Sequence, residues 1–206
     1  MRHWAFSVIV ALLILGLDGP QLAQGARAAV IVHNRARLPN HQISDALGVV
    51  RRIYSRAGVD LVTFHANSEP DIVLIDDLKI RIIVLSKEAA SAFAYPPDSV
   101  GFTPRSEGRH ARLAYILEHR VSAVSRGYNV RPAIVLGAAI AHEIGHMLLS
   151  RGHTSEGMMR AQFNQTDFRR IAAGELHFTD IEAADIRRPF PKSIVDLRAS
   201  ADASKR

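Results

Sequence analysis

Apolar residues in the first third of the chain recur in a pattern that predicts a strand, a long helix and further strands. Residues 30–32 predict the first strand, and Pro39-Asn40 supplies a break with Asn40 as a helix N-cap. The residues that follow at offsets of three and four form one apolar stripe, typical of a helix with one buried face and ended by Gly58. The stripe comprises Ile43, Ala46, Leu47, Val50, Ile53, Tyr54 and Ala57. Runs rich in β-branched residues at 59–65 and 79–85, with an extended stretch at 71–75, predict two or three strands.

The second half of the chain predicts a loop, a strand and two helices. Residues 96–112 are rich in Pro, Gly, Ser and Arg, which indicates a surface loop, and residues 111–121 predict a strand. Pro132 suits a first helical position, and residues 133–149 are apolar on nearly every face, which predicts a buried helix. Thr179 and Glu182 form a capping-box pattern for a last helix through about Arg188. With no repeat and no second domain, the pattern predicts one α+β domain.

The first 28 residues resemble a secretory signal peptide. A short basic start with Arg2 and His3 precedes an apolar run at 4–17, and Ala26-Arg27-Ala28 fits the small-x-small cleavage pattern. We therefore expect a signal peptide at 1–28, a folded domain at 29–190 and a loose tail at 191–206. An uncleaved membrane anchor is the alternative. Both place the domain outside the cytoplasm, secreted or periplasmic.

The amino-acid composition excludes several kinds of active site and binding partner. The 206 residues are 48% hydrophobic and include no Cys, which excludes thiolate nucleophiles, disulfides, iron–sulfur clusters and Cys-type zinc fingers. The net charge is +6, but the arginines are scattered and aromatic residues make up only 6%, so we expect no nucleic-acid partner. Contact with an anionic envelope surface fits the charge. We expect a monomer.

Three polar residues interrupt the predicted apolar helix, and they are the candidates for metal binding and catalysis. His142 and His146 are four residues apart and project from one helix face, so both imidazoles can bind one ion. Glu143 lies about 100° around the helix, within reach of a water on that ion. Catalytic zinc takes three protein ligands, and His153 is the first candidate for the third, with Gly152 turning the chain back. Rival third ligands are Glu156, Glu175 and His177, whereas we expect the remaining histidines to be surface or structural residues: His33, His41, His65, His110 and His119.

The residues His142, Glu143, His146 and His153, followed by Gly157-Met158-Met159, resemble the signature of the metzincin clan of zinc endopeptidases. The chain departs from that signature in having Leu149 at the usual glycine and in placing the third histidine one residue later. The resemblance implies a zincin-like fold with a small twisted mixed sheet, two long helices and a short C-terminal part. It also implies a Zn²⁺ cofactor and Met159 as the methionine beneath the metal.

The resulting hypothesis is a zinc-dependent peptidase, a hydrolase that acts on a peptide or protein substrate. Glu143 would be the general base, and an edge strand would hold the substrate. That strand could be 111–117 or the segment around Gly101-Phe102. No Tyr follows Tyr128, so the residue that stabilises the oxyanion is unassigned. The alternative hypothesis is a non-catalytic zinc-binding or partner-binding protein on the same scaffold.

Overall fold

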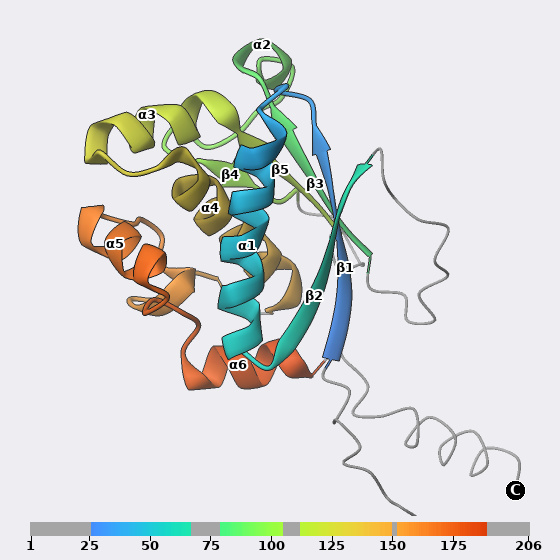
Figure 1. Ribbon diagram of the computed structural model, residues 1–206, viewed down its shortest axis with the longest axis vertical. Coiled ribbons are helices and arrows are strands. Elements are labelled where there is room, and N and C mark those ends of the chain that lie inside the picture. Colours follow the sequence, from blue (N-terminus) through green and yellow to red (C-terminus); the bar gives the residue numbers. More distant parts are fainter. Residues whose placement is uncertain (1–25, 67–78, 105–111, 150–151, 189–206) are drawn as a thin grey trace, which may run out of the picture.

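A five-stranded mixed sheet forms one layer of the protein. The computed structural model describes residues 26–66, 79–104, 112–149 and 152–188 (Figure 1). In spatial order the strands are β2 (Val59–His65), β1 (Ala26–Asn34), β3 (Lys79–Leu85), β5 (Leu113–Leu117) and β4 (Gly101–Phe102). The first four are parallel, whereas β4 runs antiparallel to β5 and forms one edge. The fold is therefore a mixed sheet with its one antiparallel strand at the edge.

Helices form the second layer, and the two longest pack on each other. These are α1 (Asn40–Arg56) and α4 (Pro132–Leu148), and Figure 1 shows both on the same side of the sheet. The shorter elements are α2 (Lys87–Ala90), α3 (Glu118–Tyr128), the 3₁₀ turn η2 (Gly157–Met159), α5 (Gln165–Ala173) and α6 (Asp180–Arg187). Helix α4 contacts α1, α3, α5, α6 and the strands β4 and β5, so it is the central element of the domain.

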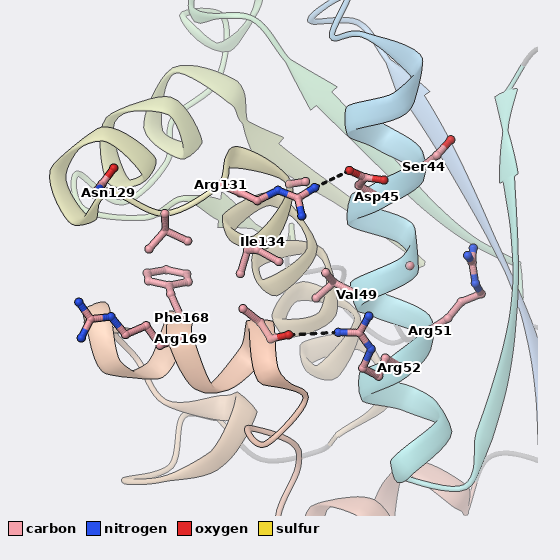
Figure 2. A pocket seen from close by; sticks show the side chains of 14 residues that line it. Ser44, Asp45, Val49, Arg51, Arg52, Asn129, Arg131, Ile134, Phe168 and Arg169 are labelled. Carbon is pink, nitrogen blue, oxygen red and sulfur yellow. Dashed lines mark hydrogen bonds and ion pairs between the residues drawn. The ribbon is translucent and has the colours of Figure 1, made fainter.

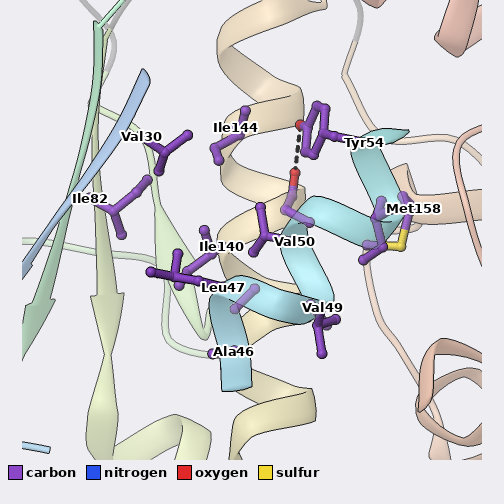
Figure 3. Close-up of a cluster of buried hydrophobic side chains, with 14 of the residues drawn as sticks. Val30, Ala46, Leu47, Val49, Val50, Tyr54, Ile82, Ile140, Ile144 and Met158 are labelled. Carbon is purple, nitrogen blue, oxygen red and sulfur yellow. Dashed lines mark hydrogen bonds between the residues drawn. The ribbon is translucent and has the colours of Figure 1, made fainter. Parts of the chain in front are cut away.

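The core lies between the sheet and the helix pair (Figure 3). Strand side chains such as Val30 and Ile82 meet Leu47 and Val50 of α1 and Ile140 of α4, all of them buried. The buried Tyr54 hydroxyl donates to the carbonyl of Ala141, 3.0 Å away, which ties α1 to the turn of α4 that carries the polar residues. This burial explains why α4 is apolar on nearly every face.

Most elements occur where the sequence pattern predicts them. The strands at 59–65 and 79–85, the buried helix from Pro132 and the last helix with its Thr179–Glu182 capping box are confirmed. The first strand is longer than predicted. The long amphipathic helix is also confirmed, but its N-cap is Pro39 and makes no side-chain hydrogen bond, so assigning that role to Asn40 was wrong.

Three segments differ from the prediction. The strand expected at 111–121 ends at Leu117, where α3 begins directly, because Val121 and Ser125 point inward at helical spacing. The expected loop at 96–112 contains strand β4 in its described part. Helix α5 was not predicted, although Asn164 and Asp167 form a capping box and Gly174 ends the helix with φ 75°.

Some predictions lie outside the described residues. These are nearly all of the signal peptide, the extended stretch at 71–75 and the tail at 191–206. Within the described part of the chain, no helix combines the length and apolarity needed to cross a membrane.

Gly137 tests the close approach of α1 and α4. A Cβ at this position would lie 2.7 Å from both the Ala46 carbonyl oxygen and Val49 Cβ, and the backbone oxygen cannot rotate away. We expect Gly137→Ala to lower the free energy of unfolding by about 1 to 3 kcal/mol, as overpacked cores do. Urea unfolding followed by circular dichroism measures the change.

Gly127→Ala is the matched control, because a Cβ on this helical glycine of α3 meets no atom within 4 Å. It should leave stability unchanged or raise it by up to about 1 kcal/mol. Equal effects of the two substitutions would contradict the packing argument.

Candidate metal and catalytic site

Three histidines from two segments bring their ring nitrogens together at the C-terminal half of α4. His146 Nε2 and His142 Nε2 each lie 3.2 Å from His153 Nε2. Among the described residues, these three form the group of His, Asp and Glu side chains whose ligand atoms can share one metal ion. The rival third ligands Glu156, Glu175 and His177 do not belong to that group.

The spacing of the three nitrogens fits tetrahedral zinc. Nitrogen ligands about 2.0 Å from a tetrahedral zinc ion lie about 3.3 Å from one another. The two pairs that include His153 Nε2 are 3.2 Å apart, and all three ligand atoms lie within 4.8 Å of one another. A proton on His153 Nε2 can serve only one of the two neighbouring nitrogens, whereas a cation satisfies all three. The donor set of three imidazoles also leaves one tetrahedral position open, as in catalytic zinc sites.

The turn after the third histidine fixes the orientation of His142. Gly157 adopts φ +71°, and the following backbone brings the Met158 carbonyl within 2.7 Å of His142 Nδ1. Donation from Nδ1–H to this carbonyl leaves the Nε2 lone pair directed at the other two rings. Burial lowers the pKa of His142 to about 4, with smaller contributions from the two neighbouring histidines, so the ring is neutral near pH 7. The neutral imidazole is the form that binds metal.

Met159 packs against the backbone of α4 at Gly145. A Cβ on Gly145 would collide with Met159 Sδ, so the glycine between the two helical histidines allows the methionine to pack directly on the α4 backbone. Both Met158 and Met159 are fully buried.

His153 is the most exposed of the three histidines, and its neighbour anchors it. The Thr154 N–H donates to the Met159 carbonyl at 2.9 Å, and Thr154 Oγ1 donates to Glu182 Oε1 at 2.9 Å. Glu182 is fully buried and also accepts from the Thr179 N–H at the start of α6. The last helix therefore holds the segment that carries His153. The expectation that Gly152 turns the chain back in a left-handed conformation was wrong. Helix α4 ends at Leu149, which is extended, and Gly152 is not among the glycines with positive φ.

Glu143 is buried beside the histidines and has one side-chain hydrogen-bond partner among the described residues. Thr103, just after β4, donates from Oγ1 to Glu143 Oε2 at 2.8 Å. Burial raises the pKa of Glu143 to about 7, while the hydrogen bond from Thr103 acts in the opposite direction. Gly101 makes this approach possible, since a Cβ there would lie 3.0 Å from Glu143 Cγ and 2.9 Å from Ile116 Cδ1. A carboxylate whose pKa lies near neutrality is suited to proton transfer.

A cleft of about 1030 Å³ opens over these residues. Its walls come from the segment 96–104, which includes β4, from α3 and α4, and from residues 160–163 and Phe168. The lining is largely apolar and aromatic, and it includes all three histidines and Glu143. Such a concave apolar cavity with a few convergent polar groups is typical of a ligand site.

A second, smaller cavity of about 560 Å³ lies between α1, α5 and the start of α4 (Figure 2). Arg131 pairs with Asp45 at 2.6 Å across its rim, and Arg52 Nη1 donates to the Ala172 carbonyl at 3.4 Å. Both side chains of the Arg131–Asp45 pair are well exposed, so it adds little stability. None of the site residues predicted from the sequence lines this cavity.

The structure places Glu143, His142, His146 and His153 on the wall of the same cleft. Met159 does not line that cleft but packs against Gly145, between the two helical histidines. The structure also shows three residues that sequence reasoning missed, namely Thr103, Thr154 and Glu182. The sequence identified Glu182 as a capping-box residue, but no sequence pattern linked Glu182 to His153. Between the two proposed edge strands the structure selects β4, because β5 is paired on both sides.

Comparisons with known proteins gave structural matches alone. No family model matches the sequence, and no curated protein matches it. Metalloproteinase-II from Bacteroides fragilis is 10% identical with a TM-score of 0.47, over 84% of this chain and 55% of that chain. Archaemetzincin from Methanopyrus kandleri is 12% identical with a TM-score of 0.49, over 82% of this chain and 98% of that chain. This chain thus spans about half the length of the Bacteroides protein, and its function has to be argued from its own side chains.

Calorimetric titration of the metal-free chain with zinc tests the histidine group. We expect one zinc ion per chain. Replacing His142, His146 or His153 by Ala should weaken binding by more than about 100-fold, since losing a ligand exceeds the 10- to 100-fold cost of losing a group that only hydrogen-bonds to one.

His41→Ala removes an exposed histidine of α1 and should leave the affinity unchanged. Unchanged zinc affinity in His153→Ala would show instead that a carboxylate or another histidine supplies the third ligand.

Proposed function

We propose that the protein is a zinc-dependent peptidase of metzincin type. The observation that carries the proposal is the group of three histidine Nε2 atoms with a buried Glu143 beside it, at the base of a cleft bordered by an edge strand. Glu143 also argues against a purely binding role, because a buried carboxylate beside the histidines is costly and a scaffold kept for its shape has no need of it.

The chain supplies a base, an orienting group and three metal ligands. A zinc ion on the histidines would supply Lewis acidity, which activates water and polarises a peptide carbonyl. Glu143 then accepts the proton of the attacking water and transfers it to the leaving nitrogen. Thr103 holds Oε2 of Glu143, and Oε1, which has no hydrogen-bond partner among the described residues, is available for this transfer. Met158 keeps the His142 ring in the tautomer that binds metal.

Strand β4 supports peptide binding. It is the last strand in the sheet order, so within the described residues one of its edges has no strand partner. An extended substrate can add to that edge through backbone hydrogen bonds, which hold a peptide independently of its side chains. Because Thr103 follows β4 directly, a peptide bound there lies next to Glu143.

We further propose that this domain acts outside the cytoplasm as a monomer, after removal of a signal peptide. The basic start and apolar run at the N-terminus support export. Cleavage after Ala28 would shorten β1 by the residues that pair with Val59, Asp60 and Leu61, and would leave residues 29–34 in the sheet. The arginines around the smaller cavity support contact with anionic envelope material, whereas no feature of the site supports a nucleic-acid partner.

Glu143→Gln tests the catalytic role directly. This variant keeps the size of the side chain and all three histidines, so zinc binding should persist while kcat falls about 10²- to 10⁴-fold with the loss of the base. Cleavage of a diverse peptide library by the zinc-loaded full chain and by the variant provides the measurement. If both hold zinc and neither cleaves any peptide, the non-catalytic binding protein becomes the better account.

Thr103 tests how Glu143 is positioned. Thr103→Val has nearly the same shape but no hydroxyl, so the carboxylate loses its only side-chain hydrogen bond in the described structure, and we expect kcat to fall about tenfold. Thr103→Ser retains the donor and should keep most of the activity. Equal losses in the Val and Ser variants would indicate that the methyl group matters and the hydrogen bond does not.

A further inference from the structure

Among the described residues that line the large cleft, Arg160 is the one arginine or lysine. Its backbone forms an isolated bridge with Thr154, the residue next to His153. Three residues later, the Phe163 ring lies against the ring of His142 with centroids 5.9 Å apart. Arg160 therefore belongs to the wall that borders the candidate metal site.

A buried carboxylate holds the Arg160 side chain in place. Its Nη1 donates to both oxygens of Asp167, at 3.0 and 3.1 Å, and Asp167 is only 2% exposed. Asp167 is itself fixed, because it forms the capping box of α5 with Asn164. A guanidinium held this way loses little conformational entropy when it binds a ligand.

The ion pair leaves most of the guanidinium available. Arginine has five N–H donors, and the two Asp167 contacts both involve Nη1. Nε and Nη2 have no partner among the described residues, and the side chain keeps 34% of its exposure. If Arg160 served only to neutralise Asp167, its remaining donors would have no reason to line a largely apolar cleft.

We infer that Arg160 determines specificity by binding a carboxylate of the peptide substrate. The fork of N–H donors matches a carboxylate in two-point geometry, and the apolar surroundings strengthen the contact. Asp98, which also lines the cleft, is acidic and cannot take this role. The carboxylate comes from an acidic side chain or from the C-terminus of the peptide. The inference rests on the proposed peptidase function.

A set of matched peptides distinguishes an acidic side chain from the peptide C-terminus as the source of the carboxylate. One peptide carries Gln at every polar position and blocked ends; a second set replaces each Gln in turn by Glu; a third has a free C-terminal carboxylate. In the wild type, we expect one carboxylate peptide to have a kcat/KM about 10- to 100-fold above that of its amide counterpart. The preferred peptide identifies the source of the carboxylate.

Substitutions of Arg160 can remove its contact with the substrate carboxylate without leaving a buried, unpaired charge at Asp167. Arg160→Gln combined with Asp167→Asn keeps the capping box and the neutrality of the pair, and it should reduce the selectivity to less than about threefold. Arg160→Lys keeps the charge but loses the planar fork, so its selectivity should lie in between. A merely structural role would lower kcat/KM for acidic and neutral peptides alike and leave their ratio unchanged.

Arg170→Gln is the control for net charge, since Arg170 is exposed on α5 and does not line the cleft. It should retain the wild-type selectivity. The inference is overturned if the wild type has no carboxylate preference, if the double variant keeps that preference, or if Arg170→Gln loses it.

Binding of the same peptides to the Glu143→Gln chain is measured by fluorescence anisotropy. This measurement distinguishes failure of the peptidase proposal from failure of the inference about Arg160. If the wild type cleaves none of the peptides, the peptidase proposal fails, and the ratio of dissociation constants with and without the Arg160 substitution decides the role of Arg160. We expect that ratio to change by about tenfold or more.

Discussion

The desolvation of three polar side chains on one apolar helix is the constraint around which this domain is arranged. Helix α4 is buried over most of its length, yet it carries His142, Glu143 and His146 near the middle of the molecule. Leaving such groups buried without partners costs several kcal/mol. Each of them therefore has a dedicated neighbour, and those neighbours come from segments widely separated in the sequence.

These neighbours explain several backbone features that packing alone would not require. Gly101 brings the edge strand close to Glu143, and Gly145 brings a methionine against the helix. Gly157 turns the chain so that a carbonyl meets His142. Close approach of backbone to a polar site needs residues without a side chain, and each of these glycines borders one of the buried polar groups.

Local patterns were enough to predict most of the fold, because strand and helix periodicities report burial directly. The exact limits of the strands at 59–65 and 79–85 and the capping box of α6 came from such patterns. The strand expected at 111–121 ran too far because Leu117 and Val121 are both apolar and buried, and apolar character does not show where an extended chain becomes a helix. The spacing of His142 and His146 placed them on one helix face. The contacts of Thr103 with Glu143 and of Glu182 with Thr154 join residues 40 and 28 positions apart, a relation that no local spacing contains.

The carboxylate of Glu182 has a consequence for the thermodynamics of the domain. One of its oxygens caps α6, and the other accepts from Thr154, beside the most exposed histidine. Local opening of α6 and displacement of the His153 segment are therefore coupled, because each removes a hydrogen bond from the same carboxylate. Any ligand that requires His153 in place makes the opening of α6 less favourable, and by reciprocity whatever stabilises α6 tightens the binding of that ligand. The C-terminal helix is thus thermodynamically part of the site, although none of its residues lines the cleft.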